Sequence, residues 1–265
     1  MASKEVVAAV SRTVGENPRI ELLTLADPGP DEVRVVLGAS AVCHSDLSYI
    51  DGDWTPELPA VWGHEAAGIV ESVGRPGNGS DSDSAVEPGD RVVVSLVRAC
   101  GACRACRAGN AVCCTGEFAT DHGSPLTDQS GAAVGRGLGT AAFAEAVVVH
   151  RSQVVAIPDE LDMTAASLLG CGVLTGVGAV RRSSPVAPGQ SVVVVGCGGV
   201  GLSAIQGAHI SAAEHIVAVD PDTDRRSLAL QLGAPVAIDQ GDRAGPEHTS
   251  ETLHKHGHLA EHVFV

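Results

Sequence analysis

The chain has 265 residues, enough for two domains with cores of their own, and 44% of them are apolar. Its formal net charge of −15 argues against a nucleic-acid partner, because phosphate binding needs clustered Lys and Arg. No apolar run is long enough for a secretory signal near the start or for a membrane span, so we expect a cytoplasmic protein without a membrane partner. In that compartment the eight cysteines favour metal binding or catalysis over disulfides.

Short Val- and Leu-rich runs separated by turns fill the first part of the chain. The predicted strands span 5–10, 19–25, 32–37, 66–73, 91–97 and 143–149. Between them, 75–85 is predicted to be a polar solvent loop, 98–116 a Cys-rich insertion and 117–140 a long irregular loop. We therefore predict a barrel-like β-domain over residues 1–151.

From residue 152 onward the pattern changes to helices that alternate with buried strands. The predicted helices span 163–181, 200–211 and 225–232, and the predicted strands span 191–195, 215–219, 235–238 and 262–265. Their continuous apolar runs are typical of a parallel sheet that is covered on both faces. We interpret the histidine-rich tail as a solvated linker rather than a metal site; its histidines are His254, His256, His258 and His262.

A glycine motif follows the first of these buried strands and opens a helix. Gly196 allows a tight turn, Gly198 lets the backbone approach a pyrophosphate, and Gly201 lets the helix pack closely on the strand. Asp220 ends the next strand, where it would accept hydrogen bonds from ribose hydroxyls and favour NAD, although Arg225 could accept a 2′-phosphate. The predicted cofactor-binding residues are Gly196, Gly198, Gly199, Gly201, Asp220 and Arg225.

Four cysteines in the insertion form C-x2-C-x2-C-x7-C: Cys100, Cys103, Cys106 and Cys114. Four thiolates at this spacing can close a tetrahedral zinc site, and closed coordination leaves no position for substrate, so this metal would be structural. Cys113 is an alternative fourth ligand. A disulfide pair, free thiols and a zinc-ribbon nucleic-acid module are the competing interpretations, and the acidic charge balance counts against the last.

A second candidate metal site lies earlier in the chain. Cys43-His44-Ser45-Asp46 and Gly63-His64-Glu65 together offer a thiol, imidazoles, a hydroxyl and carboxylates. Soft and borderline ligands with carboxylates behind them are typical of a catalytic zinc site. A third protein ligand cannot be chosen from spacing alone.

Together these motifs resemble the zinc-dependent medium-chain alcohol dehydrogenases. The matching pieces, in that family's order, are Cys43–Asp46, Gly63-His64-Glu65-x2-Gly68-x5-Gly74, the four-Cys lobe, Gly170-Cys171-Gly172, and Gly196–Gly201 with Asp220. The resemblance implies a GroES-like β-barrel catalytic domain over 1–151, with a structural-zinc lobe at 98–116. It also implies an incomplete Rossmann NAD-binding domain, a doubly wound parallel sheet, over 152–265.

The resemblance also implies a catalytic zinc held by Cys43, His64 and Cys171, so we expect two Zn²⁺ ions per chain. It implies that this zinc acts as a Lewis acid on a small alcohol or aldehyde while hydride passes between the substrate and NAD. Spacing alone would leave Cys171 a buried helix cysteine.

Further roles follow from the same resemblance. Ser45 would relay the proton, Asp46 would orient the ligand histidine, Glu65 would lie behind the zinc, and His44 would face the pyrophosphate. Ser48 stands where many relatives carry a histidine that passes the proton onward. Trp54 and Phe143 are candidates for lining the substrate pocket, with core packing as the competing interpretation.

Relatives continue beyond the fourth Rossmann strand, near which this chain ends. We therefore expect a family homo-oligomer whose usual dimer edge is missing here, with an unpaired sheet edge in its place. Two alternatives to the alcohol dehydrogenase interpretation stand: a truncated, non-catalytic zinc- and nucleotide-binding remnant, and a formaldehyde dehydrogenase that acts on a thiol adduct.

Overall fold

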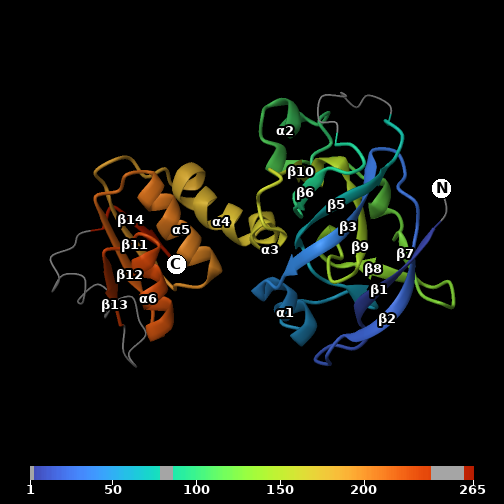
Figure 1. The fold of residues 1–265 in the computed structure, drawn as a ribbon, viewed down its shortest axis with the longest axis horizontal. Helices are drawn as coiled ribbons and strands as arrows, with labels where there is room; N and C mark the ends of the chain where they lie inside the picture. The colour runs from blue at the N-terminus through green and yellow to red at the C-terminus, as the bar shows by residue number, and fades with distance from the viewer. Residues whose placement is uncertain (1–2, 78–85, 240–259) are drawn as a thin grey trace. The chain divides into compact units, whose positions relative to one another are not determined.

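The computed structural model describes residues 3–77, 86–239 and 260–265, and it contains two compact units, Met1–Cys171 and Gly172–Val265 (Figure 1). The division falls later than the predicted boundary between residues 151 and 152. The reason is that β10 (Val154–Ala156) pairs with β6 and that α3 (Met163–Ser167) packs on β3 and β5, so both belong to the first unit.

Two sheets form the first unit. A closed barrel has the strand order β1-β2-β7-β8-β4, and a five-stranded sheet has the order β10-β6-β5-β3-β9. The strands span Lys4–Ser11 (β1), Arg19–Leu25 (β2), Glu32–Ala41 (β3), Ala60–Val61 (β4), Glu65–Val73 (β5), Arg91–Val94 (β6), Leu126–Thr127 (β7), Ala133–Arg136 (β8) and Ala146–His150 (β9). The predicted GroES-like barrel architecture is confirmed.

Alternation of side chains along the strands explains the barrel core. Val6 and Val10 of β1 are fully buried, whereas Val7 between them is 38% exposed. Leu23 of β2 is buried in the same way and Leu22 is exposed. Because successive side chains of a strand point to opposite faces, one apolar face fills the barrel and the other meets solvent.

The prediction of an irregular loop over 117–140 is wrong in part, because the loop contains β7 and β8. The two strands pair with each other, β7 pairs with β2, and β8 pairs with β4, which closes the barrel. Asp128 shapes the turn between them by accepting hydrogen bonds from the backbone N–H groups of Ser130 (2.9 Å) and Ala132 (3.1 Å). Strands of two and four residues are too short to show a period-2 pattern in the sequence.

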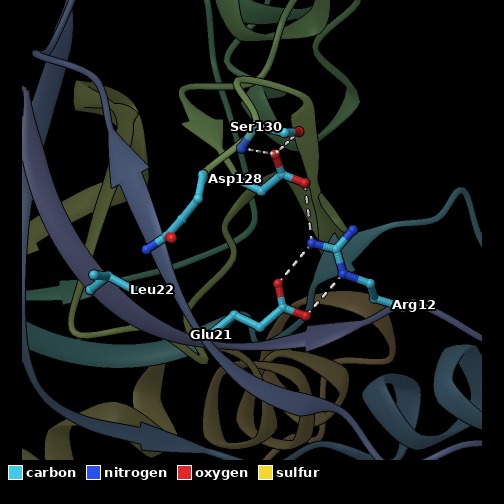
Figure 2. Close-up of a pocket in the computed structure, with 6 residues that line it drawn as sticks. Arg12, Glu21, Leu22, Asp128 and Ser130 are labelled. Atoms are coloured by element: carbon cyan, nitrogen blue, oxygen red, sulfur yellow. Dashed lines mark hydrogen bonds and ion pairs between the residues drawn. The ribbon is translucent and has the colours of Figure 1, made fainter.

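Charged side chains join this hairpin to the β1–β2 hairpin around a pocket of about 350 Å³ (Figure 2). Arg12 donates to both carboxylate oxygens of Glu21, at 2.9 and 2.7 Å, and to Asp128 Oδ2 at 3.2 Å. The Ser130 hydroxyl donates to the other oxygen of Asp128 at 2.6 Å. The charges of Arg12, Glu21 and Asp128 are paired with one another, so we interpret the cluster as a link between the two hairpins of the barrel rather than a binding site. We call these three residues, with Ser130, the Arg12 clamp.

The second unit is a four-stranded parallel sheet with the order β13-β12-β11-β14. Its elements span Gly172–Gly178 (α4), Ser191–Val195 (β11), Gly199–Ile210 (α5), His215–Val219 (β12), Thr223–Gln231 (α6), Val236–Ile238 (β13) and His262–Phe264 (β14). Val192 packs with Ile205 of α5 on one face, and Val193 packs with Val217 on the other. Apolar burial on both faces explains the continuous valine run, and the predicted incomplete Rossmann sheet is confirmed.

The stretch 163–181 is not the continuous helix that its spacing predicted. It consists of α3, a 3₁₀ turn (Leu168–Gly170), α4 and a π turn (Ala179–Ser183), with Cys171 in a non-helical conformation (φ −145°, ψ −67°) between the second and third. A Cβ on Gly170 would lie 2.5 Å from the carbonyl oxygen of Val94. The backbone therefore runs directly against the sheet just before Cys171, and the helix is interrupted there.

Among the described residues, no single helix has the length and apolar composition of a membrane span; only the helical pair 163–170 and 172–183, taken together across its bend, meets that criterion. In the tail, His254, His256 and His258 lie outside the described residues, as does most of the predicted polar loop 75–85. His262 belongs to β14, where its Nδ1 lies 2.9 Å from the Ser184 hydroxyl.

Candidate functional site

Four potential metal ligands converge within the first unit. The ligand atoms of Cys43, His64, Glu65 and Cys171 all lie within 4.8 Å of one another. Cys43 precedes α1 (His44–Asp51), His64 immediately precedes β5 and Glu65 begins it, and Cys171 follows the 3₁₀ turn that lies against the sheet. The structure thus brings together the three ligands implied by the resemblance, although more than a hundred residues separate the first from the last.

Asp46 connects the segments that carry these ligands through hydrogen bonds. Its carboxylate is fully buried and accepts hydrogen bonds from the backbone N–H groups of Cys43 (3.0 Å) and Gly63 (2.9 Å). His64 Nδ1 lies 3.1 Å from the same carboxylate. One side chain on α1 therefore fixes both ligand-bearing segments and orients the imidazole.

The hydrogen bond to Asp46 determines which nitrogen of His64 is available. With Nδ1–H donated to the carboxylate, Nε2 keeps a free lone pair for a metal ion. Burial opposes protonation of the ring, but hydrogen bonds with Asp46 and Cys171 outweigh it and raise the pKa of His64 to about 10. Binding of a metal ion at Nε2 would displace that proton.

The remaining predicted residues lie around the same point. Ser45 is half-buried in the first turn of α1, beside Cys43, and Glu65 is buried at the start of β5. His44 is exposed at the first residue of α1. Ser48, which stands in place of a relay histidine, is buried, so its hydroxyl does not extend into solvent as a histidine would.

The donor set fits zinc. Two thiols and one imidazole are borderline-soft ligands that Zn²⁺ prefers, and tetrahedral zinc places such atoms about 3.4–3.8 Å apart, within the observed limit of 4.8 Å. Three such ligands leave one coordination position for a substrate oxygen, the arrangement of a catalytic site. The fourth side chain, Glu65, is a carboxylate in reach of the same point.

The four cysteines of the lobe converge separately. The Sγ atoms of Cys100, Cys103, Cys106 and Cys114 lie within 4.8 Å of one another, and all four residues are half-buried. Cys103 precedes α2 (Arg104–Arg107) and its Sγ accepts the N–H of Cys106. This group also fits zinc, and its four thiols close the coordination shell.

Backbone N–H groups support negative charge on these sulfurs. Cys114 Sγ accepts from the N–H groups of Cys100 (3.2 Å) and Gly116 (3.3 Å). At Cys103 the backbone hydrogen bond from Cys106 lowers the pKa of the thiol to about 5. Cys113 is exposed and does not belong to the converging group, so the alternative fourth ligand is not supported by the geometry.

The glycine motif of the second unit forms a tight turn between β11 and α5. Gly196 has φ +92°, and a Cβ on Gly201 would lie 1.8 Å from the carbonyl oxygen of Gly196. Only glycine fits that approach of helix and strand. Gly198 precedes α5 and Gly199 begins it, and no atom within 4 Å obstructs either position, which leaves the backbone N–H groups accessible to a phosphate.

Asp220 lies against this turn at the end of β12. It is 2% exposed and accepts the N–H groups of Cys197 (2.7 Å) and Asp222 (2.8 Å). The bond to Cys197, which ties the carboxylate to the glycine turn, has no signal in the sequence. Arg225 is exposed on α6, while Arg226 donates to the carbonyl oxygen of Asp220 at 2.7 Å.

An aromatic cluster beside α1 was not anticipated. Tyr49 of α1 stacks on Trp62 with ring centroids 4.7 Å apart, and Trp54 meets Tyr49 edge-on at 5.1 Å. Phe143 packs against the core of the barrel. Trp62 immediately precedes Gly63-His64 in the chain, and this adjacency is the signal that could have drawn attention to it.

Comparison with known proteins places these features in one family. Residues 29–159 match the alcohol dehydrogenase GroES-like domain. The chain is 38% identical, over 97% of its length and 68% of the relative's, to an NDMA-dependent alcohol dehydrogenase from Amycolatopsis methanolica. It is also 38% identical, over 86% of its length and 60% of the relative's, to an S-(hydroxymethyl)glutathione dehydrogenase from Saccharomyces cerevisiae. The chain thus spans between 60% and 68% of these curated relatives.

Solved structures agree. An alcohol dehydrogenase zinc-binding domain protein from Burkholderia ambifaria superposes with a TM-score of 0.87 at 32% identity, over 98% of this chain and 70% of that one. An acetophenone reductase from Geotrichum candidum, solved in complex with NAD, superposes with a TM-score of 0.71 at 27% identity, over 88% of this chain and 63% of that one.

Proposed function

Because the chain belongs to the zinc-type medium-chain alcohol dehydrogenase family, we propose that it transfers a hydride between a small alcohol or aldehyde and NAD at a zinc centre. One observation carries the proposal. Cys43, His64 and Cys171 converge with Glu65 within 4.8 Å, although nothing local in the sequence holds them together. Two thiols and an imidazole in that arrangement match a catalytic zinc site with an open position.

Cys43, Cys171 and Nε2 of His64 would hold the zinc ion. When bound, zinc supplies a Lewis acid that polarises the oxygen of the substrate. Asp46 keeps Nδ1–H of His64 directed away from the metal, and it fixes the backbone of Cys43 and Gly63 at the same time. These contacts preserve the geometry of the ligands while substrates exchange.

Ser45 is the proposed proton acceptor. Its hydroxyl lies in the first turn of α1 beside the ligand Cys43, so it can accept the proton of the alcohol and pass it onward. The buried Ser48 does not supply the next step, so water or a ribose hydroxyl takes that proton in our proposal. Glu65 adds negative charge behind the ligands, and His44, exposed at the start of α1, is the proposed pyrophosphate contact.

NAD is the proposed cofactor, and when bound it supplies the hydride acceptor. The Gly196–Gly201 turn and the N–H groups at the start of α5 would bind its pyrophosphate. Asp220 uses each carboxylate oxygen for only one backbone N–H, so lone pairs remain for the ribose hydroxyls, while its charge would repel a 2′-phosphate. Arg225 is exposed beside it and is the residue that would bind such a phosphate.

A second, structural zinc is proposed for Cys100, Cys103, Cys106 and Cys114, because four thiols leave no position for a substrate. A cytoplasmic location is also proposed, because seven of the eight cysteines converge in two groups suited to metal binding, which is the use of cysteine expected in a reducing compartment. A homo-oligomer is proposed by analogy with the family, with neither nucleic acid nor membrane as a partner.

The decisive experiment is NADH formation by the purified chain with a panel of alcohols, combined with metal analysis. We expect two zinc ions per chain and turnover that a phenanthroline chelator abolishes, while the non-chelating isomer of phenanthroline leaves it intact. Cys171→Ala should lose one zinc and all turnover, whereas Cys113→Ala should lose neither. A folded chain with two zinc ions that turns over none of the alcohols would overturn the proposal and favour a non-catalytic remnant.

The thiol-adduct reaction is a second candidate, because the relative from Saccharomyces cerevisiae is named for it and is as similar as the alcohol dehydrogenase above. The same assay decides between them. Turnover of formaldehyde only when glutathione is present would favour the adduct, whereas turnover of simple alcohols without a thiol favours the first proposal.

A further inference from the structure

The segment that leads from β6 into the four-Cys lobe lies against the turn that joins β9 to β10. This turn is a 3₁₀ helix (Arg151–Gln153), and we call residues 95–99 the lobe entry. Ser95 N–H donates to the carbonyl oxygen of Gln153 at 2.8 Å, and the Gln153 amide donates back to the carbonyl oxygen of Ser95 at 3.0 Å. Ala99 N–H donates to the Ser152 hydroxyl at 2.9 Å. This last contact is a side-chain bond directly before the first cysteine of the lobe.

The Ser152 hydroxyl is in turn bonded to an imidazole. Nδ1 of His150 lies 2.8 Å from Ser152 Oγ, and it accepts the backbone N–H of Ser152 at 3.2 Å. Because a backbone N–H can only donate, Nδ1 must be the unprotonated nitrogen of the ring. The hydroxyl therefore donates to Nδ1 and accepts from Ala99. A continuous chain of hydrogen bonds thus runs from the end of β9 to the lobe entry.

His150 acts as the N-cap of the 3₁₀ turn. Its side chain accepts the Ser152 N–H, and its own backbone N–H donates to the Gln153 side chain at 3.2 Å. Capping side chains are usually those of Ser, Thr, Asn or Asp, whose oxygen atoms remain acceptors near neutral pH. An imidazole caps a turn only while the nitrogen concerned is unprotonated. The cap therefore depends on a group that titrates near neutral pH.

The segment that leaves the lobe contacts the same imidazole. Phe118 is 7% exposed, and its ring lies edge-on to that of His150 with centroids 4.8 Å apart. The guanidinium of Arg98, in the lobe entry, lies 4.5 Å from the centroid of the Phe118 ring and donates to Asp121 at 2.5 Å. His150 is thus connected to both ends of the lobe.

The surroundings of His150 favour its neutral form. Burial lowers the pKa of the imidazole below its ordinary value, and the charges of Arg151 and Arg98 lower it further, whereas Asp31 opposes them. Glu32 is the cross-strand neighbour of His150 on β3, and its carboxylate accepts a backbone N–H at 2.8 Å. The hydrogen bonds to Ser152 and the charges around the ring therefore require the same protonation state.

We propose that neutral His150 latches the lobe entry to the turn between β9 and β10 through Ser152, and that protonation of His150 opens this latch. A proton on Nδ1 removes the acceptor of the Ser152 N–H and adds a positive charge near Arg98 and Arg151. The four cysteines lie within one segment, so the lobe moves as a unit when the latch opens. His150 is accordingly a positioning residue for the lobe and not a metal ligand.

The pH dependence of the latch follows from the direction of the pKa shift. The closed latch holds the pKa of His150 below its ordinary value near 6.5, so opening takes up a proton when the pH falls below that value. The latch is most stable above about pH 6.5. The ratio of closed to open molecules should fall by up to about tenfold per pH unit below 6.5, until the pH reaches the pKa of the closed state.

Hydrogen exchange of the Ala99 amide in the full chain measures the latch directly. Its protection factor, which is corrected for the intrinsic effect of pH on exchange, should fall several-fold, up to about tenfold, between pH 7.5 and pH 5.5. The Ser95 amide is bonded to a backbone carbonyl and is the control, which should not change. Constant protection of Ala99 would overturn the proposal, and so would an equal fall at Ser95, because the opening would then not be confined to the latch.

Three variants separate the latch from a purely structural role of His150. His150→Asn supplies an amide oxygen near the position of Nδ1 and does not titrate, so protection of Ala99 should be high at both pH values. His150→Phe keeps a ring beside Phe118 without an acceptor, and Ser152→Ala removes the hydroxyl, so both should show low protection at both pH values. A His150→Asn chain with the pH dependence of the wild type would overturn the proposal.

The tautomer provides a test that needs no substitution. Long-range ¹H–¹⁵N spectra of the wild-type chain at pH 7.5 should show an unprotonated Nδ1 and a protonated Nε2 for His150. A proton on Nδ1 at that pH would overturn the proposal, because the Ser152 N–H would then have no acceptor there. None of these measurements depends on turnover, so they decide the latch whether or not the proposed function holds.

Discussion

The two groups of candidate metal ligands in this chain are assembled in opposite ways. The lobe draws four thiols from the segment between Cys100 and Cys114 and supports them with N–H groups of that same segment. The centre draws Cys43, His64 and Cys171 from three distant segments. The lobe cysteines are half-buried, whereas His64 and the Asp46 carboxylate to which it is hydrogen-bonded are at most 1% exposed.

This difference separates what each site depends on. The geometry of the lobe is local, so we expect the lobe to depend on its proposed metal ion more than on the rest of the domain. The centre exists only when the barrel, the five-stranded sheet and α1 have all formed, because Asp46 ties the segments together through backbone N–H groups. We therefore expect the lobe to be disrupted mainly by loss of its metal ion. We expect the centre to be disrupted by any change that shifts its three ligand-bearing segments relative to one another.

The largest effect is expected from His64→Ala. Loss of one of three protein ligands should release the metal of the centre and reduce kcat/KM for the best alcohol by more than about a thousandfold. Metal analysis should still find one zinc per chain, held by the lobe. Loss of both zinc ions would show that the two sites are not independent of each other.

The next largest effect is expected from Cys103→Ala. This change removes a lobe ligand and also the sulfur that accepts the N–H of Cys106 at the start of α2. The chain should lose one zinc, and its melting temperature should fall by several degrees, because a structural metal contributes folding free energy. Cys113→Ala, a neighbouring exposed thiol outside the group, is the matched control and should change neither quantity. A Cys103→Ala chain that kept two zinc ions would contradict the proposed ligand set.

A smaller, selective effect is expected from Asp46→Asn. The amide keeps the shape of the side chain but loses the charge, and its NH₂ group faces backbone N–H donors. Zinc affinity at the centre should fall about 10- to 100-fold, as it does when outer partners of a metal ligand are changed. Competition with a chromophoric chelator would resolve one weakened site and one unchanged site. Equal loss of zinc affinity at both sites would mean that the Asp46 carboxylate contributes to the stability of the whole domain and not to the positions of the ligands at the centre.

How much of each site the sequence reveals follows from the same contrast. The four cysteines of the lobe lie in one segment, so their spacing predicted the candidate site, although only the geometry separated Cys114 from Cys113. Spacing also predicted the glycine turn and Asp220 at the end of the next strand. Cys171 is different: no periodicity links it to Cys43, and only the family resemblance pointed to it. Its non-helical conformation, which follows from contact of Gly170 with the sheet, is a tertiary effect that helical spacing could not anticipate.

The elements of the fold likewise divide into those that local sequence predicts and those that depend on tertiary contacts. Valine runs buried on both faces predicted β11 and β12 closely, because sheet burial is uniform along them. The short strands β7 and β8 were missed, because pairing across the barrel and not their composition makes them strands. The Tyr49–Trp62 pair was missed for a related reason, since two rings separated along the chain meet only when α1 lies beside β4.

The smallest effect concerns the Arg12 clamp, which lies on the barrel that aligns the centre. The Ser130 hydroxyl and then Arg12 lower the pKa of Asp128 to about 2. A carboxyl with a lowered pKa stabilises the folded chain above its ordinary value near 3.8, and that contribution disappears as pH falls through about 2. Asp128→Asn should therefore melt slightly below the wild type at neutral pH, and the gap should close as pH falls from about 4 toward 2.

Thermal melts of both chains from pH 7 to pH 2.5 provide the measurement. Glu16→Gln is the control, because Glu16 pairs with Arg19 at a site where both side chains are more than half exposed, and screening should leave its melting temperature unchanged. β8 pairs with β4, which leads directly to Trp62 and His64, so the clamp supports the long-range centre and not the local lobe. Asp128→Asn should accordingly speed the release of zinc from the centre to a chelator and leave release from the lobe unchanged. An equal change in zinc release at both sites would contradict the proposal that the Arg12 clamp supports only the long-range centre.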